Sequence, residues 1–248
     1  MARALAVIVA TTCLLATGCG GGDSPDLKVS AAASLKTALT DYARGFDAAT
    51  SRFSFAGSDV LAAQLRAGAR PDVYAAANAS LPSALAAEGL VERPVAFARN
   101  RLVIAVPAGS ERVQSVEDLG SDGLRLVIGA ASVPIGAYTQ AVLGRLEPVL
   151  RGRIMRSVRS HEPDVSGIVG KLGTGAVDAG FVYASDVRAA KGRLRAIPLP
   201  DALEPEVVYQ AAVVRGGAHP EQARAFVAGL RGQEGQKALH AAGFLPPP

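Results

Sequence analysis

The residues best placed for chemistry in this chain are small or hydroxyl-bearing residues at points where an apolar run passes into a helical pattern. Ser34 and Ser58 each follow such a run in the first third of the chain, and Ile135 and Val165 occupy the same kind of position further on. A helix N-terminus leaves about four backbone N–H groups without a partner and carries a partial positive charge. An anion can therefore bind there without a cationic side chain.

These four helix starts could meet in one cleft. In a parallel α/β sheet the helices begin where the strands end, and ligands bind at that edge. The simpler interpretation is that Ser34 and Ser58 only cap their helices. The pattern predicts an anion site built from neutral donors and leaves the identity of the anion open.

Features that would indicate catalysis or a metal ion are missing from the sequence. It contains no Gly-x-Ser-x-Gly motif, and His161, His219 and His240 are not spaced as a metal-binding pair. We expect His161 to lie in a loop, and the other two to lie at the surface near helix ends. The chain is therefore predicted not to be an enzyme and to hold neither a metal cation nor a cofactor.

The N-terminus has the layout of a secretory signal. Arg3 precedes an apolar run of about a dozen residues, and Leu15-Ala16-Thr17-Gly18-Cys19 resembles the bacterial lipobox. We expect residues 1–18 to be a signal peptide, Cys19 to be lipidated, and residues 19–26 to form a flexible tether to the membrane. Ordinary cleavage, with Cys19 incidental, is the alternative. Cys13 would be lost with the signal, and no later segment is apolar for the length of a membrane span.

Downstream of the tether, short apolar runs alternate with helical patterns, which predicts an α/β fold with mostly parallel sheets. Strands are expected at residues 27–31, 52–56, 72–76, 101–106, 124–129, 154–158, 179–183 and 207–214. Helices are expected at residues 34–48, 58–67, 80–88, 135–146, 165–172, 220–231 and 234–241.

The order of these elements favours two lobes joined by two crossings, near residues 103–107 and 202–209. Residues 27–104 and 205–248 would form the first lobe, and residues 105–204 the second. Two strand connections at one boundary are what a hinge needs.

Charge adds little to this interpretation. The formal net charge is +4, and loss of Arg3 with the signal leaves 4 − 1 = +3. The basic residues are scattered, which argues against nucleic-acid binding. We expect a monomer.

Several ordered motifs resemble the molybdate-binding proteins of ABC transporters, a branch of the type II periplasmic-binding-protein fold. The matching stretches run in the family's order: residues 31–35 (AAASL), 55–58 (FAGS), 71–73 (PDV), 133–138 (VPIGAY), 164–165 (DV) and 180–186 (GFVYASD). The resemblance implies two α/β lobes with the ligand cleft between them, and covers nearly the whole mature chain.

The resemblance also implies a set of ligand contacts. Ser34 and Ser58 would give hydroxyl groups, Ile135 and Val165 backbone N–H groups, and Tyr183 its phenol hydroxyl. The ligand would be molybdate or tungstate, delivered to the permease subunits of an ABC importer at the outer face of the membrane. Sulfate or a small organic anion is the alternative.

One departure from the family pattern is Asp59, which stands where the family often has a second serine. A carboxylate beside a dianion would repel it. We therefore expect Asp59 to turn outward or to cap its own helix.

Overall fold

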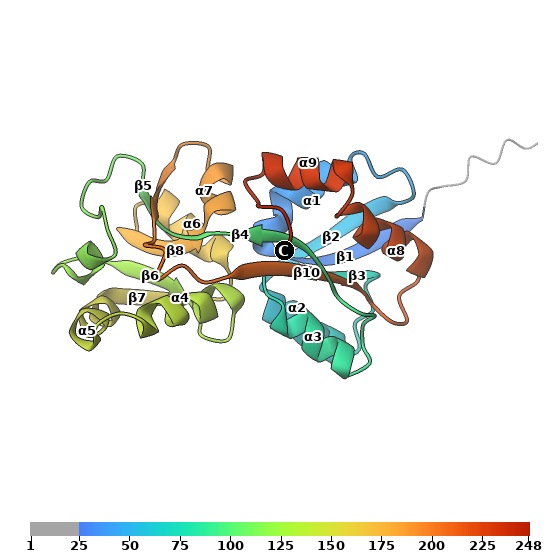
Figure 1. Cartoon of the computed structure of the whole chain (residues 1–248), viewed down its shortest axis with the longest axis horizontal. Coiled ribbons are helices and arrows are strands. Elements are labelled where there is room, and N and C mark those ends of the chain that lie inside the picture. The colour runs from blue at the N-terminus through green and yellow to red at the C-terminus, as the bar shows by residue number, and fades with distance from the viewer. Residues whose placement is uncertain (1–24) are drawn as a thin grey trace, which may run out of the picture.

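The computed structural model describes residues 25–248, so the expected signal peptide and Cys19 lie outside the described residues. Two lobes lie side by side, each built on a five-stranded sheet (Figure 1). The first sheet has the order β2 (Thr50–Ala56), β1 (Asp26–Ala32), β3 (Val73–Ala76), β10 (Val207–Val213), β4 (Val95–Asn100). The second has the order β7 (Val158–Glu162), β6 (Leu126–Gly129), β8 (Ala179–Tyr183), β5 (Leu102–Pro107), β9 (Leu194–Pro198). The predicted two-lobe α/β fold is confirmed.

Both sheets are mixed rather than mostly parallel. In the first, β1 pairs in parallel with β2 and β3, whereas β10 is antiparallel to β3 and β4. In the second, β6 is parallel to β7 and β8, and β5 is antiparallel to β8 and β9. The strand that arrives from the other lobe, β10 or β5, causes the difference, because it enters each sheet from the opposite end.

Helices cover both faces of each sheet (Figure 1). The first lobe carries a short 3-10 turn η1 (Ala33–Leu35), α1 (Lys36–Ala43), α2 (Ser58–Arg66), α3 (Ser80–Ala87), α8 (Pro220–Gly229) and α9 (Gln233–Ala241). The second carries the 3-10 turn η2 (Glu117–Gly120), α4 (Pro134–Gly144), α5 (Pro148–Ser157), α6 (Val165–Gly173) and α7 (Ala184–Ala189). None of the helices in residues 25–248 has the length and hydrophobicity that a membrane-spanning helix needs.

Some sequence-based boundaries were wrong. Residues 154–157 end helix α5, and the strand expected there begins only at Val158 and runs to Glu162. His161 therefore lies in a strand and not in a loop. The helix expected at 34–48 ends at Ala43, and the tether expected to reach residue 26 ends before it, because Asp26 already pairs with Thr50. The elements β4, β9, α5 and α7 were not predicted.

The chain crosses between the sheets at two neighbouring places. The first crossing lies between Asn100 and Leu102, so the expected division after residue 104 falls inside β5. The second lies between β9 and β10. The buried Asn100 side chain donates from Nδ2 to Ser185 Oγ at 2.8 Å, and Arg101 Nε lies 3.4 Å from Glu204 Oε1. These contacts tie the two crossings to each other and to the start of α7.

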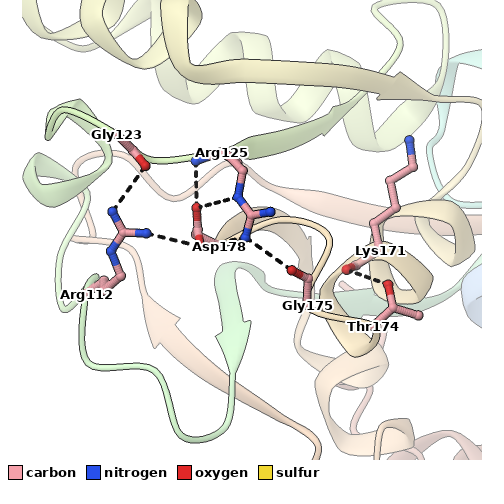
Figure 2. Close-up of polar contacts among 7 residues, drawn as sticks. All are labelled: Arg112, Gly123, Arg125, Lys171, Thr174, Gly175 and Asp178. Atoms are coloured by element: carbon pink, nitrogen blue, oxygen red, sulfur yellow. Dashed lines mark hydrogen bonds and ion pairs between the residues drawn. The ribbon is translucent and has the colours of Figure 1, made fainter.

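Away from the crossings, an ion-pair cluster fastens the loops of the second lobe (Figure 2). Asp178, which precedes β8, accepts hydrogen bonds from the backbone and side-chain nitrogens of Arg125 at 2.8–3.2 Å. Arg112 Nη1 lies 3.2 Å from the same carboxylate. Burial opposes ionisation of Asp178, but the Arg125 hydrogen bonds and the two positive charges hold its pKa below the usual 3.8.

We predict that Asp178→Asn lowers the free energy of unfolding by about 1–2 kcal/mol at pH 7, since hydrogen bonds to charged groups are lost while partial exposure limits the effect. A carboxyl with a lowered folded pKa stabilises above its unfolded pKa, and this contribution is lost as the pH falls through the folded value. Urea denaturation of both proteins should therefore show a difference that shrinks below about pH 3.8. A difference that grows in acid would contradict this account.

Candidate functional site

A small pocket lies between the lobes, where the strands of both sheets end. Its walls come from the segments that follow β1, β2 and β3 in the first lobe, and β6, β7 and β8 in the second. The lining residues are Ala32, Ala33, Ser34, Ala56, Gly57, Ser58, Ala77, Val133, Pro134, Ile135, Asp164, Val165 and Tyr183. All five residues predicted as ligand contacts are among them. The structure thus brings together positions up to 149 residues apart, from Ser34 to Tyr183 (183 − 34).

The first lobe presents two serine hydroxyls. Ser58 is the first residue of α2 and is 1% exposed. Its Oγ accepts a hydrogen bond from the backbone N–H of Ala77 at 3.1 Å, and Tyr74 donates to its carbonyl oxygen at 2.7 Å. Because the Ala77 N–H occupies an acceptor position of Ser58 Oγ, the Ser58 hydroxyl can donate its own proton to a ligand in the pocket.

In the second lobe, backbone N–H groups at two helix starts face the pocket. Ile135 lies in the first turn of α4, which has no side-chain cap. At α6 the Asp164 carboxylate accepts from the N–H groups of Ser166 and Gly167, at 2.7 and 3.3 Å. The N–H of Val165, one position earlier, is not part of that cap, and helix geometry gives it no partner within α6.

Tyr183, at the end of β8, supplies the fifth group. Its hydroxyl is buried and has no hydrogen-bond partner among the described residues. Burial raises its pKa well above the usual 10.0, so the phenol keeps its proton and can donate. The backbone N–H of Tyr183 donates to Asp186 Oδ2 at 3.0 Å, which fixes the end of the strand. Burial raises the pKa of Asp186 to about 7.

The pocket is small, lined by buried residues and without positive side chains. Its five predicted contact residues are no more than 9% exposed. The cavity volume is about 20 Å³, far below the roughly 300–1,000 Å³ of pockets for drug-sized ligands. No lysine or arginine lines it, and its one charged residue, Asp164, already serves as a helix cap. A buried donor without an acceptor costs about 1–3 kcal/mol, so the geometry suits a small ligand rich in acceptor oxygens.

Asp59 differs in part from expectation. It is not among the lining residues, but it neither caps α2 nor turns fully outward. Its Oδ1 is buried without a hydrogen-bond partner among residues 25–248. A Cβ on Gly57 would lie 2.8 Å from this oxygen and 2.5 Å from the carbonyl oxygen of Pro163. Gly57 is thus a point of close backbone approach between the two lobes beside the pocket, which sequence reasoning missed.

In the part of the chain that the structure describes, the histidines and the other side chains that could bind a metal ion give no sign of a second kind of site at this pocket. None of the three histidines lines it. Within the described residues, no group of three or more His, Cys, Asp or Glu is arranged to hold a metal ion. The site offers hydrogen-bond donors and no nucleophile paired with a base.

Two lobes joined by two crossings, with a donor-lined pocket between them, are the architecture of proteins that bind a small solute between two domains. The family model for bacterial extracellular solute-binding proteins matches residues 27–245. The chain belongs to this family, whose members bind solutes and are not enzymes, as the sequence predicted.

Individual relatives indicate which members of the family this chain resembles in sequence and fold. The molybdate-binding protein ModA of Mycobacterium tuberculosis is 35% identical over 229 residues, covering 88% of this chain and 84% of the relative. This similarity places the chain among the ModA-type members of the family. A Bacillus subtilis relative named as an ABC transporter substrate-binding lipoprotein is 26% identical over 253 residues, covering 94% of each chain. The solved periplasmic molybdate-binding protein of Azotobacter vinelandii shares the fold, with a TM-score of 0.79, 22% identity, and coverage of 90% of this chain and 100% of the other.

We predict that Gly57→Ala obstructs closure of the lobes, because the added Cβ would meet the Pro163 carbonyl oxygen at 2.5 Å. Small-angle scattering should show a larger radius of gyration than for the wild-type protein under the same conditions. Gly144→Ala is the matched control, since a Cβ there meets nothing within 4 Å. An unchanged radius for Gly57→Ala would show that the lobes can close without this contact.

Proposed function

We propose that this protein captures molybdate or tungstate as the extracytoplasmic binding protein of an ABC importer and delivers the ion to the permease subunits. Two observations support this proposal. The pocket matches a small acceptor-rich ion, and the M. tuberculosis relative is named for molybdate binding.

The observation that carries the proposal is a buried pocket whose donors are all neutral. A tetrahedral oxyanion has an acceptor oxygen on every side. Donors can surround it here: the hydroxyls of Ser34, Ser58 and Tyr183 and the N–H groups of Ile135 and Val165. Hydrogen bonds to an ionised acceptor are about twice as strong as neutral ones, which offsets desolvation of the dianion. A protonated anion such as hydrogen phosphate would turn its own O–H toward a donor and lose an interaction.

The position of the protein outside the cytoplasmic membrane follows from the signal-like N-terminus. We propose that Cys19 carries a lipid anchor and that the folded part acts as a monomer on this tether. The lipobox-like sequence supports the anchor, as does the lipoprotein name of the B. subtilis relative. Mass spectrometry of the membrane-extracted protein, with Cys19→Ala as the control, tests this part directly.

Isothermal titration of a soluble form that begins after Cys19 tests the ligand. Molybdate and tungstate have the same charge and nearly the same size, so both should bind one-to-one, and sulfate and phosphate should bind far more weakly. Binding of sulfate alone would keep the transport role and change the substrate. Absence of binding to all four ions would overturn the proposal.

We predict that Ser58→Ala weakens molybdate binding tenfold or more, because one hydrogen bond to a charged group is worth roughly 1.5–3 kcal/mol. The measurement is the same titration. Ser83→Ala, on the exposed side of α3, is the matched control and should bind as the wild type does. Wild-type affinity in Ser58→Ala would remove this residue from the site.

A further inference from the structure

Tyr209 lies directly behind the pocket, although neither the sequence nor the pocket lining identified it. It belongs to β10, the strand that returns from the second lobe, and the pairing of β10 with β4 is irregular between Tyr209 and Gln210. Bulges of this kind re-aim side chains and are frequent beside functional sites. The Tyr209 side chain is fully buried, at 0% exposure.

Aromatic rings from both lobes hold the Tyr209 ring. Its centroid lies 5.2 Å from Phe244 and 6.3 Å from Phe97, both in edge-on contact within the first lobe. On the other side it lies 5.8 Å from Tyr183 of the second lobe, also edge-on. These contacts leave the ring little freedom, so the position of its hydroxyl is set by packing.

The Tyr209 hydroxyl lies 2.9 Å from Ser34 Oγ, and both groups are buried. Either oxygen could donate in this pair. Burial raises the pKa of Tyr209 well above 10.0, so its hydroxyl carries a proton at physiological pH. A bound ligand with only acceptor oxygens fixes the direction of this hydrogen bond. The Ser34 hydroxyl can bind such a ligand only by donating its proton to it, so Tyr209 must then be the donor to Ser34.

Ser58 shows the same arrangement with a different partner. There the Ala77 N–H donates to the serine oxygen, which leaves the serine proton available for a ligand in the pocket. We propose that Tyr209 is a positioning residue that plays the corresponding part for Ser34: it donates its hydroxyl proton to Ser34 Oγ and so turns the Ser34 proton toward the bound anion.

This inference rests on the proposed function and adds a source of specificity to it. The chain Tyr209 O–H to Ser34 O–H to anion oxygen runs in one direction, and each hydrogen bond in such a chain polarises the next. The Tyr209 hydroxyl already occupies one acceptor position of Ser34 Oγ, so the serine is set up to donate. It therefore favours a fully deprotonated anion over an anion that must donate a proton. The contact of Tyr209 with Tyr183 places this chain against the second lobe as well.

A double-mutant cycle tests the inference, because it isolates the coupling between two side chains. The dissociation constant is measured by titration for the wild type, Tyr209→Phe, Ser34→Ala and the double variant. Molybdate is the probe; if the wild type binds only tungstate or sulfate, that ion replaces it. Tyr209→Phe keeps the ring and its aromatic contacts, so thermal unfolding of the ligand-free protein should change little. The matched control is Tyr42→Phe, which removes a buried hydroxyl bonded to the Phe226 carbonyl oxygen away from the pocket.

We expect Tyr209→Phe to weaken binding roughly 2- to 12-fold, as loss of a hydrogen bond worth about 0.5–1.5 kcal/mol implies. In the Ser34→Ala background the same change should alter the dissociation constant less than about twofold, and Tyr42→Phe should leave it unchanged. An equal loss in both backgrounds, or no loss in either, would overturn the role of Tyr209 while leaving the proposed function intact. A wild-type protein that binds sulfate alone would overturn the proposed substrate, yet the cycle with sulfate would still decide the role of Tyr209. Failure to bind any of the three ions would overturn both.

Discussion

The hydrogen-bonding capacity of helix N-termini is the constraint on which this arrangement depends. Exposed helix starts are satisfied by water, but the starts of η1, α2, α4 and α6 are buried around one pocket. Their free N–H groups and neighbouring hydroxyls need acceptors. A small oxyanion supplies several at once, and the partial positive charge of the helix ends compensates its charge without a lysine or arginine.

The two sheets repeat one topology, and this repetition creates the pocket. Each sheet contains three mutually parallel strands, and the first of the three in the chain lies between the other two, as in β2–β1–β3 and β7–β6–β8. Ser34, Ser58 and Ala77 follow the three strands of one lobe, and Ile135, Val165 and Tyr183 hold the matching places in the other. When two such edges face each other, donors surround the enclosed space from both sides. The backbone approach at Gly57 and Pro163 then closes it.

Sequence patterns predicted most of the elements that carry the site, because strand-to-helix transitions leave strong periodic signals. The prediction failed where local patterns mislead: the apolar residues near Ile154 belong to a helix that packs through few buried side chains. The edge strands β4 and β9 were missed because each is followed by the next strand of the chain without an intervening helix. Gly57 and Tyr209 act through contacts between distant segments, and no local sequence pattern reports such contacts.

The central claim is that a dianion lies between the two lobes, held by neutral donors alone. The most direct test is a crystal structure of the protein grown with molybdate, with the metal located by its anomalous scattering. The account predicts one peak between the hydroxyls of Ser34, Ser58 and Tyr183 and the N–H groups of Ile135 and Val165, with each of these donors within about 3.2 Å of an oxygen of the ion. A peak elsewhere, or an ion paired with lysine or arginine side chains, would contradict it.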